Sequence, residues 1–458
     1  MPLPVVGNII QLSGGNIVTS LLKLKDTYGE VFIIYLGSRP VVVITGYKAV
    51  KDVLVDRGDD FLGRGDMFIF DAVYKNHGVG LTTDVKRWKE LRRFSVMTMR
   101  DFGMGKRKIE DHIQNEAQCL VEELKKTKEE CFNPRELMNK VSSNIIHSIM
   151  FGTRHDYNDK ELIRVLHCIQ ESFFITSSAW GQLFEMFPRI MYFLPGKHQK
   201  VISDIEELQH YVMGKVEMNR KTLDPDNPRD YVDAFLMKME KDKNDPKSEF
   251  NLSNLVTSTL QIFFAGVETT STTLTYALLI LMKYPEVLAK ICEEIEHNIG
   301  QDRSPKVQDR NQMPYTDAVI HEIHRFIDLL PMGVPRKTTR NMEFRGYFLP
   351  KDTNIYVFLS SVLKDPSYFP YSNEFDPHNF LDKNGKFKKN DAFLPFSAGK
   401  KNCLGEGLVR MDIFIFIVTI LQKFQLKSEF PQEDLDVTPV VSGFGNISKP
   451  FKMSFISR

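Results

Sequence analysis

The chain lacks the cysteine pairs that mark a disulfide framework or a zinc site. Its five cysteines are scattered, without CxxC or CxxxH spacing, and are Cys119, Cys131, Cys168, Cys292 and Cys403. This pattern excludes a small disulfide-stapled domain and a zinc ribbon, and it is typical of a protein in a reducing compartment.

The chain also lacks any run of about 18 or more apolar residues, so no membrane-spanning segment is visible. A net charge of only +1 gives no reason to expect a nucleic-acid partner. No linker divides the 458 residues, so we predict a single domain over residues 1–458, although the length alone would allow two. The chain opens directly in a proline-rich stretch, residues 1–8, without a charged leader or a signal segment.

Hydrophobic residues make up 42% of the chain and charged residues 26%, as in an ordinary globular protein with a large core. Two β-branched runs, residues 30–37 and 40–45, predict a hairpin in a β-richer part at about residues 28–50. Most of the remainder reads as helical, and residues 252–283, which contain no proline, predict one helix of roughly 45–50 Å. Short strands are predicted at residues 342–349 and 354–358. The predicted fold class is therefore mainly α, with small peripheral β-sheets.

Cys403 stands out because its surroundings suit a sulfur that holds a metal. Gly399 and Gly405 bracket it and permit tight turns that bring backbone amides around one atom, and Phe396 lies upstream in the same segment. The residues after Cys403 predict a helix, whose N-terminus would favour the thiolate over the thiol. A thiolate in a dry aromatic setting can hold haem iron through one sulfur. A buried structural cysteine is the alternative.

The predicted long helix contains a run of hydroxyl residues, from Thr269 to Thr273, directly after Glu268. Such side chains compete for backbone groups, so we expect the helix to be locally opened there. Hydroxyl-lined space beside Ala265 and Gly266 suits a flat cofactor, bound O2 and the water molecules that deliver protons. A Ser/Thr patch on a solvent face is the alternative.

These motifs resemble those of the cytochrome P450 superfamily, the haem-thiolate monooxygenases. The loop around Cys403 resembles the family's haem-binding loop, and residues 265–269 resemble its oxygen-activation motif. The resemblance covers essentially the whole chain and is closest to vertebrate microsomal members of the family-two type, which oxidise drugs and fatty acids. Residues 314–331, 392–400 and 438–443 carry that closer likeness. The resemblance implies the cytochrome P450 fold, with a long central helix over haem b.

Microsomal members of the family carry a membrane-anchoring helix before a proline-rich stretch like residues 1–8. The chain therefore looks like a truncated catalytic domain, either engineered or an incomplete gene product, from which the anchor is missing. The implied location is the cytoplasmic face of the endoplasmic reticulum membrane.

The resemblance also assigns roles around the haem. Cys403 would be the iron ligand, Thr269 would stabilise iron-bound dioxygen, and Glu268 would relay protons. The other implied haem contacts are Arg64, Trp88, Arg92, Ala265, Arg336, Phe396 and Lys401, of which Trp88 and Arg92 would bind a propionate. Relatives usually carry arginine where Lys401 stands, and lysine lacks the planar fork, so we expect looser haem retention.

Glu322 and Arg325 resemble the family's buried structural pair beneath the haem, whose third partner comes from residues 375–380. Asn379 stands where relatives usually place Arg or His, so the third charge is absent. An amide at this position can still hydrogen-bond to Arg325.

The implied substrate pocket is apolar and favours lipophilic molecules of modest size, such as xenobiotics, fatty acids or steroids. The matching positions are Met67, Phe68, Phe70, Phe173, Phe174, Thr176, Phe263, Phe264, Leu329, Met332, Val334, Val441 and Phe444. Residues 184–195 are rich in aromatic and aliphatic side chains, and we expect them to rest on a membrane surface, to roof the pocket, or both.

A set of basic residues is expected to attract an acidic electron donor, which in this family is the NADPH-cytochrome reductase or cytochrome b5. These residues are Lys89, Arg93, Arg100, Lys400 and Arg410, and solvated surface charge is the alternative. The function that follows is insertion of one oxygen atom of O2 into a lipophilic molecule, with electrons from NADPH through the reductase. Two other classes stay open: a haem-thiolate isomerase or dehydratase, which needs no reductase, and a non-enzymatic haem sensor or carrier.

Overall fold

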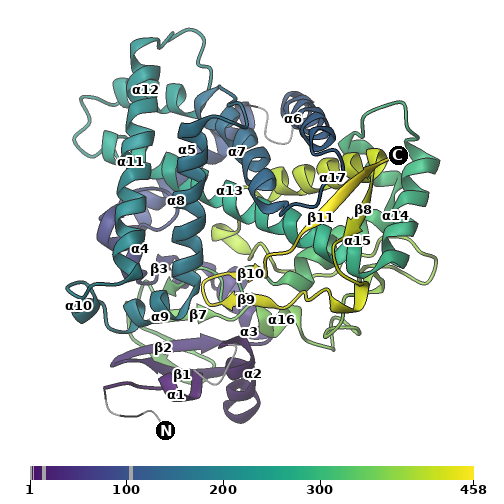
Figure 1. The fold of residues 1–458 in the computed structure, drawn as a ribbon. Coiled ribbons are helices and arrows are strands. Elements are labelled where there is room, and N and C mark those ends of the chain that lie inside the picture. The colour runs from purple at the N-terminus through teal and green to yellow at the C-terminus, as the bar shows by residue number, and fades with distance from the viewer. Residues whose placement is uncertain (1–2, 4, 13–16, 103–106) are drawn as a thin grey trace.

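The computed structural model describes residues 3, 5–12, 17–102 and 107–458. Met1, Pro2 and Pro4 of the proline-rich start lie outside the described residues. As predicted, the described part is mainly helical, with strands gathered into small sheets (Figure 1). The α-helices are α1 (Ile9–Leu12), α2 (Ile17–Tyr28), α3 (Tyr47–Lys51), α4 (Phe68–Tyr74), α5 (Val85–Asp101), α6 (Arg107–Lys126), α7 (Arg135–Phe151), α8 (Lys160–Ser177), α9 (Ala179–Met186), α10 (Pro188–Met191), α11 (Lys197–Lys221), α12 (Tyr231–Lys241), α13 (Leu252–Lys283), α14 (Pro285–Asn298), α15 (Pro314–Ile327), α16 (Ser360–Leu363) and α17 (Glu406–Lys423).

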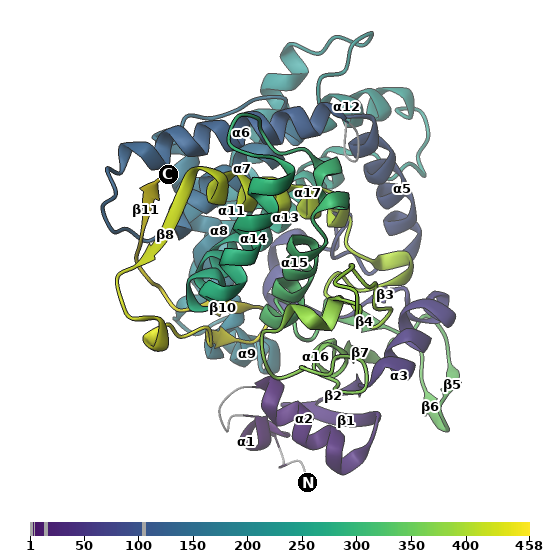
Figure 2. The ribbon, with the colours of Figure 1, turned by 90° about the vertical axis from the view of Figure 1, so that its right-hand side faces the viewer.

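The strands are short and belong to one mixed sheet and three two-stranded sheets within the described residues. They are β1 (Val31–Leu36), β2 (Arg39–Ile44), β3 (Gly63–Arg64), β4 (Arg336–Lys337), β5 (Met342–Phe344), β6 (Tyr347–Leu349), β7 (Asn354–Val357), β8 (Phe424–Ser428), β9 (Pro439–Ser442), β10 (Asn446–Ser448) and β11 (Met453–Ser457). The mixed sheet has the order β1-β2-β7-β4-β3, and β2 and β7 run parallel in it. Figures 1 and 2 show β1 and β2 at one end of the molecule, beside α1 and α2.

The predicted N-terminal hairpin is confirmed, because β1 and β2 pair antiparallel with Val31 opposite Ile44. The prediction of one continuous strand at residues 342–349 is wrong. β5 and β6 form a hairpin there, and the turn residues Arg345 and Gly346 have φ of 50° and 83°. Two consecutive positive φ values reverse the chain with the twist that a two-residue hairpin needs.

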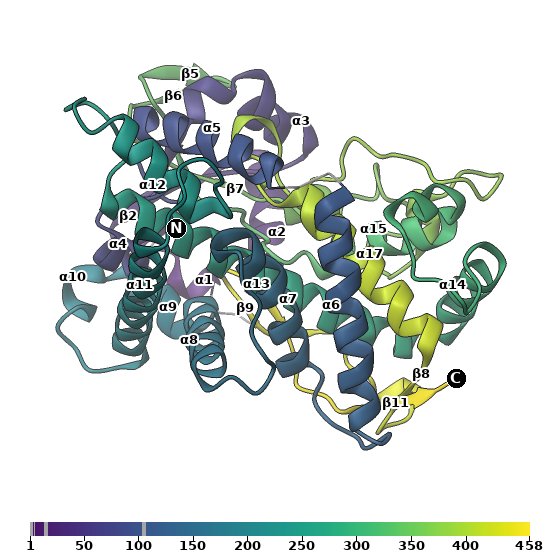
Figure 3. The ribbon, with the colours of Figure 1, turned by 90° about the horizontal axis from the view of Figure 1, so that it is seen from above.

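The helix α13 spans Leu252–Lys283, the range predicted from its lack of proline, and passes through the middle of the helices (Figures 1 and 3). It begins at Asn251, whose side-chain oxygen accepts the backbone amide of Asn254. Most of its side chains are buried, and it packs against α7, α11 and α17 within the main hydrophobic core. None of the described helices is long and apolar enough to cross a membrane.

The expected local opening of α13 is wrong, because the helix is continuous through its hydroxyl-rich part. The hydroxyl of Thr269 donates to the carbonyl of Ala265 at 2.7 Å. Thr273 donates in the same way to the carbonyl of Thr269, at 2.8 Å. These hydroxyls therefore share carbonyls of the preceding turn and do not displace the helical hydrogen bonds.

A buried ion pair ties α15 to the chain that follows β7. Glu322 and Arg325 lie 2.6 Å apart, and the side chain of Arg325 is only 1% exposed. The guanidinium also donates to the carbonyls of Leu363, Ser372 and Glu374 at 2.9, 2.8 and 2.8 Å. One arginine thus fixes residues 363–374 against α15.

Asn379 joins the buried pair through Glu322 and forms no hydrogen bond with Arg325. Its side-chain nitrogen donates to Glu322 at 3.2 Å, and its side-chain oxygen accepts the backbone amide of Tyr371 at 3.1 Å. The guanidinium of Arg325 donates to Glu322 and to backbone carbonyls, and the side-chain amide of Asn379 donates to the carboxylate of Glu322.

Removing the guanidinium of Arg325 would leave Glu322 charged and buried without its partner, which costs about 3–5 kcal/mol. We expect Arg325→Met to lower the free energy of unfolding by that amount in urea denaturation followed by circular dichroism. Arg303→Met removes a partly exposed pair with Asp309 and is the matched control, with an expected loss of about 1 kcal/mol or less. Equal losses in the two variants would contradict a structural role for the buried pair.

Candidate functional site

The loop before α17 folds around Cys403. The backbone amide of Cys403 donates to the carbonyl of Phe396 at 2.9 Å and so closes the loop. Gly399 has φ of +71°, and a Cβ there would lie 1.8 Å from the carbonyl oxygen of Leu54, so only glycine fits. The sulfur of Cys403 accepts hydrogen bonds from the backbone amides of Gly405 and Glu406, at the start of α17. As predicted, a helix start directs amides at the sulfur.

These amides do not by themselves stabilise the thiolate. Burial raises the pKa of the Cys403 thiol above its ordinary value, although the amide of Gly405 and the guanidinium of Arg92 pull it down. The Cys403 side chain is itself exposed, but the surrounding protein still reduces the solvation of a charge on the sulfur. The amides therefore act in the predicted direction, but burial of the thiol outweighs them.

Four cations from distant parts of the chain meet beside this loop. They are Arg64 on β3, Arg92 on α5, Arg336 on β4 and Lys401 in the 3₁₀ turn Gly399–Lys401. The ammonium of Lys401 lies 4.3 Å from the centre of the Trp88 ring, on which it packs. Arg92 donates to the backbone and side-chain oxygens of Asn402, both at 2.8 Å, which fixes α5 to the loop.

None of the described carboxylates forms an ion pair with these four cations. Lys401 is 4% exposed, and its ammonium has no hydrogen-bond partner. Burial and the repulsion of the neighbouring arginines lower the pKa of Lys401 to about 5 and that of Arg64 to about 9. Anions placed among these groups would reverse the shifts, and the two carboxylates of a haem supply that charge. The residues therefore fit the haem that the resemblance implies.

The middle of α13 presents a small, accessible surface within an otherwise buried helix. Ala265 is exposed and Thr269 is partly exposed, whereas Phe264, Val267 and Glu268 are buried. Gly266 is needed for a reason other than the predicted close approach of a cofactor. A Cβ there would lie 2.6 Å from Ile146, so the glycine lets α7 pack against α13.

Glu268 is 2% exposed, and only one of its two carboxylate oxygens has a hydrogen-bond partner. One carboxylate oxygen accepts the hydroxyl of Thr272 at 3.2 Å, and the other has no hydrogen-bond partner. Arg135 of α7 donates to the same hydroxyl at 3.3 Å. Burial raises the pKa of Glu268 to about 7, against the opposite pull of Arg135. The carboxyl group can therefore hold or release a proton near neutral pH.

Four of the predicted substrate residues form an aromatic cluster, although they come from α4, α8, α13 and the turn between β9 and β10. The ring centre of Phe70 lies 6.3 Å from that of Phe264 and 6.1 Å from that of Phe444. Phe173 lies 5.9 Å from Phe444. These segments thus build one apolar surface, as predicted.

A small cavity of about 80 Å³ adjoins the aromatic cluster through Phe444. The predicted residues Met67, Thr176 and Met332 also line it, with residues that were not predicted, among them Ile17, Ile34, Leu36, Gln182, Glu185 and Tyr356. The hydroxyl of Thr176 is buried without a hydrogen-bond partner. The cavity therefore combines apolar walls with a free hydrogen-bonding group.

Six of the other predicted substrate residues do not line this cavity. Phe68, Phe174, Leu329, Val334 and Val441 are partly buried and pack against the main core. The structure does not support a substrate role for Phe263, which is fully buried with its ring 6.0 Å from His147 and 6.2 Å from Phe151. Neighbouring positions on a helix point about 100° apart, so Phe263 and Phe264 face different neighbours.

Of the five predicted docking cations, four are exposed and Arg410 is partly buried. Lys89, Arg93 and Arg100 are exposed on α5, and Lys400, also exposed, pairs with Asp59 at 2.6 Å. The structure does not support a docking role for Arg410.

Arg410 is partly buried between α15 and α17. It pairs with Glu406 at 3.0 Å and lies 2.7 Å from a ring nitrogen of His321. Its guanidinium also packs on the ring of Phe396 at 5.3 Å. These contacts use the charge of Arg410 inside the protein and give it a structural role.

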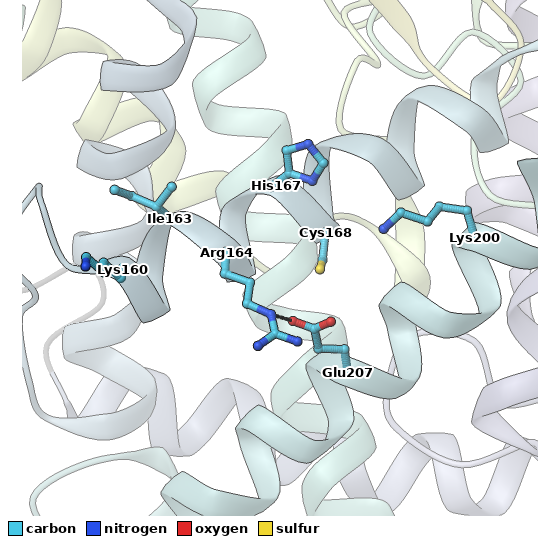
Figure 4. Close-up of a pocket in the computed structure, with 7 residues that line it drawn as sticks. All are labelled: Lys160, Ile163, Arg164, His167, Cys168, Lys200 and Glu207. Atoms are coloured by element: carbon cyan, nitrogen blue, oxygen red, sulfur yellow. Dashed lines mark ion pairs between the residues drawn. The ribbon is translucent and has the colours of Figure 1, made fainter.

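A separate groove of about 390 Å³ lies between α8 and α11 and is lined by Lys160, Ile163, Arg164, His167, Cys168, Lys200 and Glu207 (Figure 4). Arg164 and Glu207 point toward one another and form an ion pair. Lys200 pairs with Asp204. The groove contains none of the predicted site residues, and its charges largely neutralise one another.

Sequence reasoning missed the polar residues that hold the site residues in place. Asn402 holds Arg92 from 310 positions away, and Arg135 reaches Thr272 across 137 positions. No local pattern signals such pairs, because each depends on how distant elements pack.

The buried ammonium of Lys401 predicts a measurable effect on haem retention. A hydrogen bond to a charged group contributes about 1.5–3 kcal/mol, so we expect Lys401→Met to speed haem transfer to a haem-scavenging apoprotein by roughly 10–100-fold. Lys400→Met changes the adjacent, exposed lysine and should leave the rate unchanged. Equal rates for the two variants would show that Lys401 does not hold the cofactor.

Comparisons with known proteins agree with this site. A family model described as "Cytochrome P450" matches residues 1–455. The chain is 49% identical over 457 residues to "Cytochrome P450 2G1" of Oryctolagus cuniculus, which covers 100% of this chain and 92% of that protein. It is 48% identical to "Cytochrome P450 2B4" of the same species, over 100% of this chain and 93% of that protein. It is 49% identical to "Cytochrome P450 2C11" of Rattus norvegicus, over 99% of this chain and 91% of that protein. The chain therefore belongs to the cytochrome P450 family, as a haem-thiolate monooxygenase of the family-two type.

Proposed function

We propose that residues 1–458 form one catalytic domain, in which Cys403 ligates the haem iron and the four clustered cations hold the haem carboxylates. The observation that carries this assignment is the meeting of Arg64, Arg92, Arg336 and Lys401 beside the Cys403 loop, with no ion-pair partner among the described carboxylates. Trp88 and Phe396 would complete the cradle, since the first packs on Lys401 and the second closes the loop. Ala265, small and exposed, would contact the flat face of the haem.

When bound, the haem supplies O2 activation, with electrons that a flavoprotein reductase takes from NADPH, so that one oxygen atom enters the substrate and the other leaves as water. Glu268 and Thr269 would deliver the protons that this chemistry consumes. Arg135 and Thr272 steady one oxygen of the Glu268 carboxyl group, and the other oxygen is left to exchange a proton. Thr269 donates its own proton to Ala265, so the lone pairs of its hydroxyl stay available as acceptors.

The substrate would lie against the aromatic cluster of Phe70, Phe173, Phe264 and Phe444, next to the accessible part of α13. Apolar walls favour lipophilic molecules, such as xenobiotics, fatty acids or steroids. Thr176, whose buried hydroxyl has no partner, would orient a substrate that carries one polar group. A charged group at this place would lose its hydration without compensation.

The electron donor would dock on the exposed face of α5. Lys89, Arg93 and Arg100 lie on this face, and Arg92 of the same helix contacts Asn402 next to Cys403. A donor bound here would thus lie close to the sulfur side of the site. An acidic surface suits these cations, and the proposed partners are the NADPH-cytochrome reductase and cytochrome b5.

The short helix α10 and the residues after it would rest on the cytoplasmic face of the endoplasmic reticulum membrane. Ile190, Tyr192, Phe193 and Leu194 are 62%, 51%, 83% and 46% exposed, and we call them the α10 patch. Contiguous exposed apolar side chains of this kind mark interaction sites. Phe187, by contrast, packs against the core and does not belong to the patch.

The proton relay predicts a pH dependence. Glu268 carries a proton below its raised pKa of about 7 and loses it as the pH rises through that value. We therefore expect the coupling of NADPH oxidation to product formation to fall as the pH rises through about 7. Glu268→Gln cannot exchange the proton and should be poorly coupled at every pH, with hydrogen peroxide released instead of product. Glu286→Gln, at an exposed position of α14, should keep the original profile, whereas an unchanged midpoint in Glu268→Gln would assign the titration to another group.

The α5 docking face predicts a salt-dependent electron transfer. We expect Arg93→Glu to slow reduction of the haem protein by the reductase about tenfold at low ionic strength, and less at high salt, because steering by charge is screened. Arg220→Glu makes the same charge change at an exposed position of α11 and should have little effect. Stopped-flow reduction rates measure this difference, and a similar slowing in both variants would rule out a specific face.

The α10 patch predicts membrane affinity. Burying one large apolar side chain contributes about 1.5–3 kcal/mol, so Phe193→Asp should reduce co-sedimentation with phospholipid vesicles roughly tenfold or more. Ile163→Asp, at a 43% exposed position on α8, should not reduce it. Unchanged co-sedimentation of Phe193→Asp would place the membrane contact elsewhere.

A further inference from the structure

Two histidines and a tyrosine outside the haem site bring their polar atoms together. His147 lies on α7, His155 in the segment before α8, and Tyr211 on α11. Nε2 of His147 lies 3.1 Å from Nε2 of His155 and 2.8 Å from the hydroxyl of Tyr211. The hydroxyl lies 3.5 Å from Nε2 of His155. Three atoms with lone pairs therefore converge on one point.

The other ring nitrogen of each histidine has an acceptor of its own. Nδ1 of His155 lies 2.7 Å from a carboxylate oxygen of Asp159, and Nδ1 of His147 lies 3.1 Å from the carbonyl of Thr153. The carboxylate of Asp159 only accepts hydrogen bonds, so Nδ1 of His155 carries a proton. Nδ1 of His147 lies 3.1 Å from both the carbonyl and the hydroxyl of Thr153, so it can donate to the first or accept from the second. When Nδ1 of His147 donates to the carbonyl of Thr153, the Nε2 atoms of both neutral rings carry lone pairs, which face each other at 3.1 Å. In that tautomer the two lone pairs repel each other, and a metal ion between the rings would relieve the repulsion.

The surroundings of the two rings resemble those of metal-binding histidines. Such a ligand characteristically donates its second ring N–H to a carboxylate or a backbone carbonyl, which fixes the tautomer and the ring orientation. Asp159 is itself fixed, because it caps α8 by accepting the amides of Glu161 and Leu162.

We propose that Nε2 of His147, Nε2 of His155 and the hydroxyl of Tyr211 bind one divalent transition-metal ion of the zinc class, with water completing its shell. Two nitrogens about 2.0–2.1 Å from a tetrahedral ion lie about 3.3 Å apart, close to the 3.1 Å found here. His147 is fully buried, whereas His155 and Tyr211 are partly exposed and leave a path for entry.

This site is weaker than a closed structural zinc site. Among the described residues, no group of three or more His, Cys, Asp or Glu side chains could hold a metal ion. Two imidazoles, a phenol and water must therefore suffice. Burial raises the pKa of Tyr211, so its hydroxyl stays protonated in the absence of the ion. Zinc binding should accordingly be reversible.

Ion binding would join α11 to α7 beside the central helix. The ring of Phe263 on α13 lies 6.0 Å from that of His147 and 6.4 Å from that of Tyr211. The next residue, Phe264, faces the aromatic cluster. An ion that binds the folded state and not the unfolded state should therefore stabilise the helices around the substrate pocket.

The test uses the haem-loaded protein with one equivalent of zinc chloride. Zinc K-edge X-ray absorption should show a nitrogen and oxygen shell at about 2.0–2.1 Å that includes two imidazoles. Zinc should also raise the midpoint of thermal unfolding. His155→Phe should lose both the bound zinc and the rise, whereas His297→Gln, at an exposed position of α14, should keep both.

Three results would overturn the proposal: a shell with sulfur or a single imidazole, a rise that persists in His155→Phe, or no zinc retained by the unchanged protein. The last result would mean that a proton on one of the two rings, and not a metal ion, separates the two nitrogens. The absorption spectrum needs no variant, so it decides the matter even where His155→Phe does not fold.

Discussion

The mutual repulsion of four clustered cations, two of them buried and two partly buried, is the constraint on which the rest of this structure depends. Arg64 and Arg336 come from adjacent strands of the mixed sheet, Arg92 from α5, and Lys401 from the loop before α17. Their charges meet only when the sheet, the helix and the loop are all in place. Like charges gathered in the interior are costly, and an anionic cofactor removes that cost. Assembly of these elements and binding of the haem are therefore coupled.

The central helix α13 brings an apolar side chain and a buried carboxyl group close together. Phe264 joins the aromatic cluster, whereas Glu268, one turn later, is buried with a pKa near neutrality. Between them, Gly266 lets Ile146 of α7 approach the helix closely. The same helix α7 contributes Arg135, which steadies Thr272 and through it Glu268. The contacts of α7 thus support the part of α13 that we propose for substrate binding and proton transfer.

Much of the fold and several site positions could be predicted from the sequence. The lack of proline in residues 252–283 predicted α13, and two β-branched runs predicted the hairpin of β1 and β2. The glycines around Cys403 correctly indicated a tight loop with amides directed at sulfur. These features are local, so nearby residues determine them.

The wrong predictions concern competing interactions, such as hydrogen bonding against burial, whose outcome depends on how the chain packs. Hydroxyl groups in α13 were expected to open the helix, but they share carbonyls within it. Arg410 was assigned to a docking surface, although Glu406 and His321 engage it beneath the surface. The pKa of Cys403 was expected to fall, but burial outweighs the amides. The pairing of Arg92 with Asn402 joins segments far apart in the chain, so no sequence pattern indicated it.

The central claim is that Cys403 is the sulfur that holds the haem iron. The most direct measurement is the absorption spectrum of the reduced, carbon monoxide-bound protein, in which thiolate ligation shifts the main haem band to long wavelength. Cys403→Ser should abolish the shifted band, while the four cysteine variants Cys119→Ser, Cys131→Ser, Cys168→Ser and Cys292→Ser should retain it. A shifted band that survives in Cys403→Ser would contradict the account.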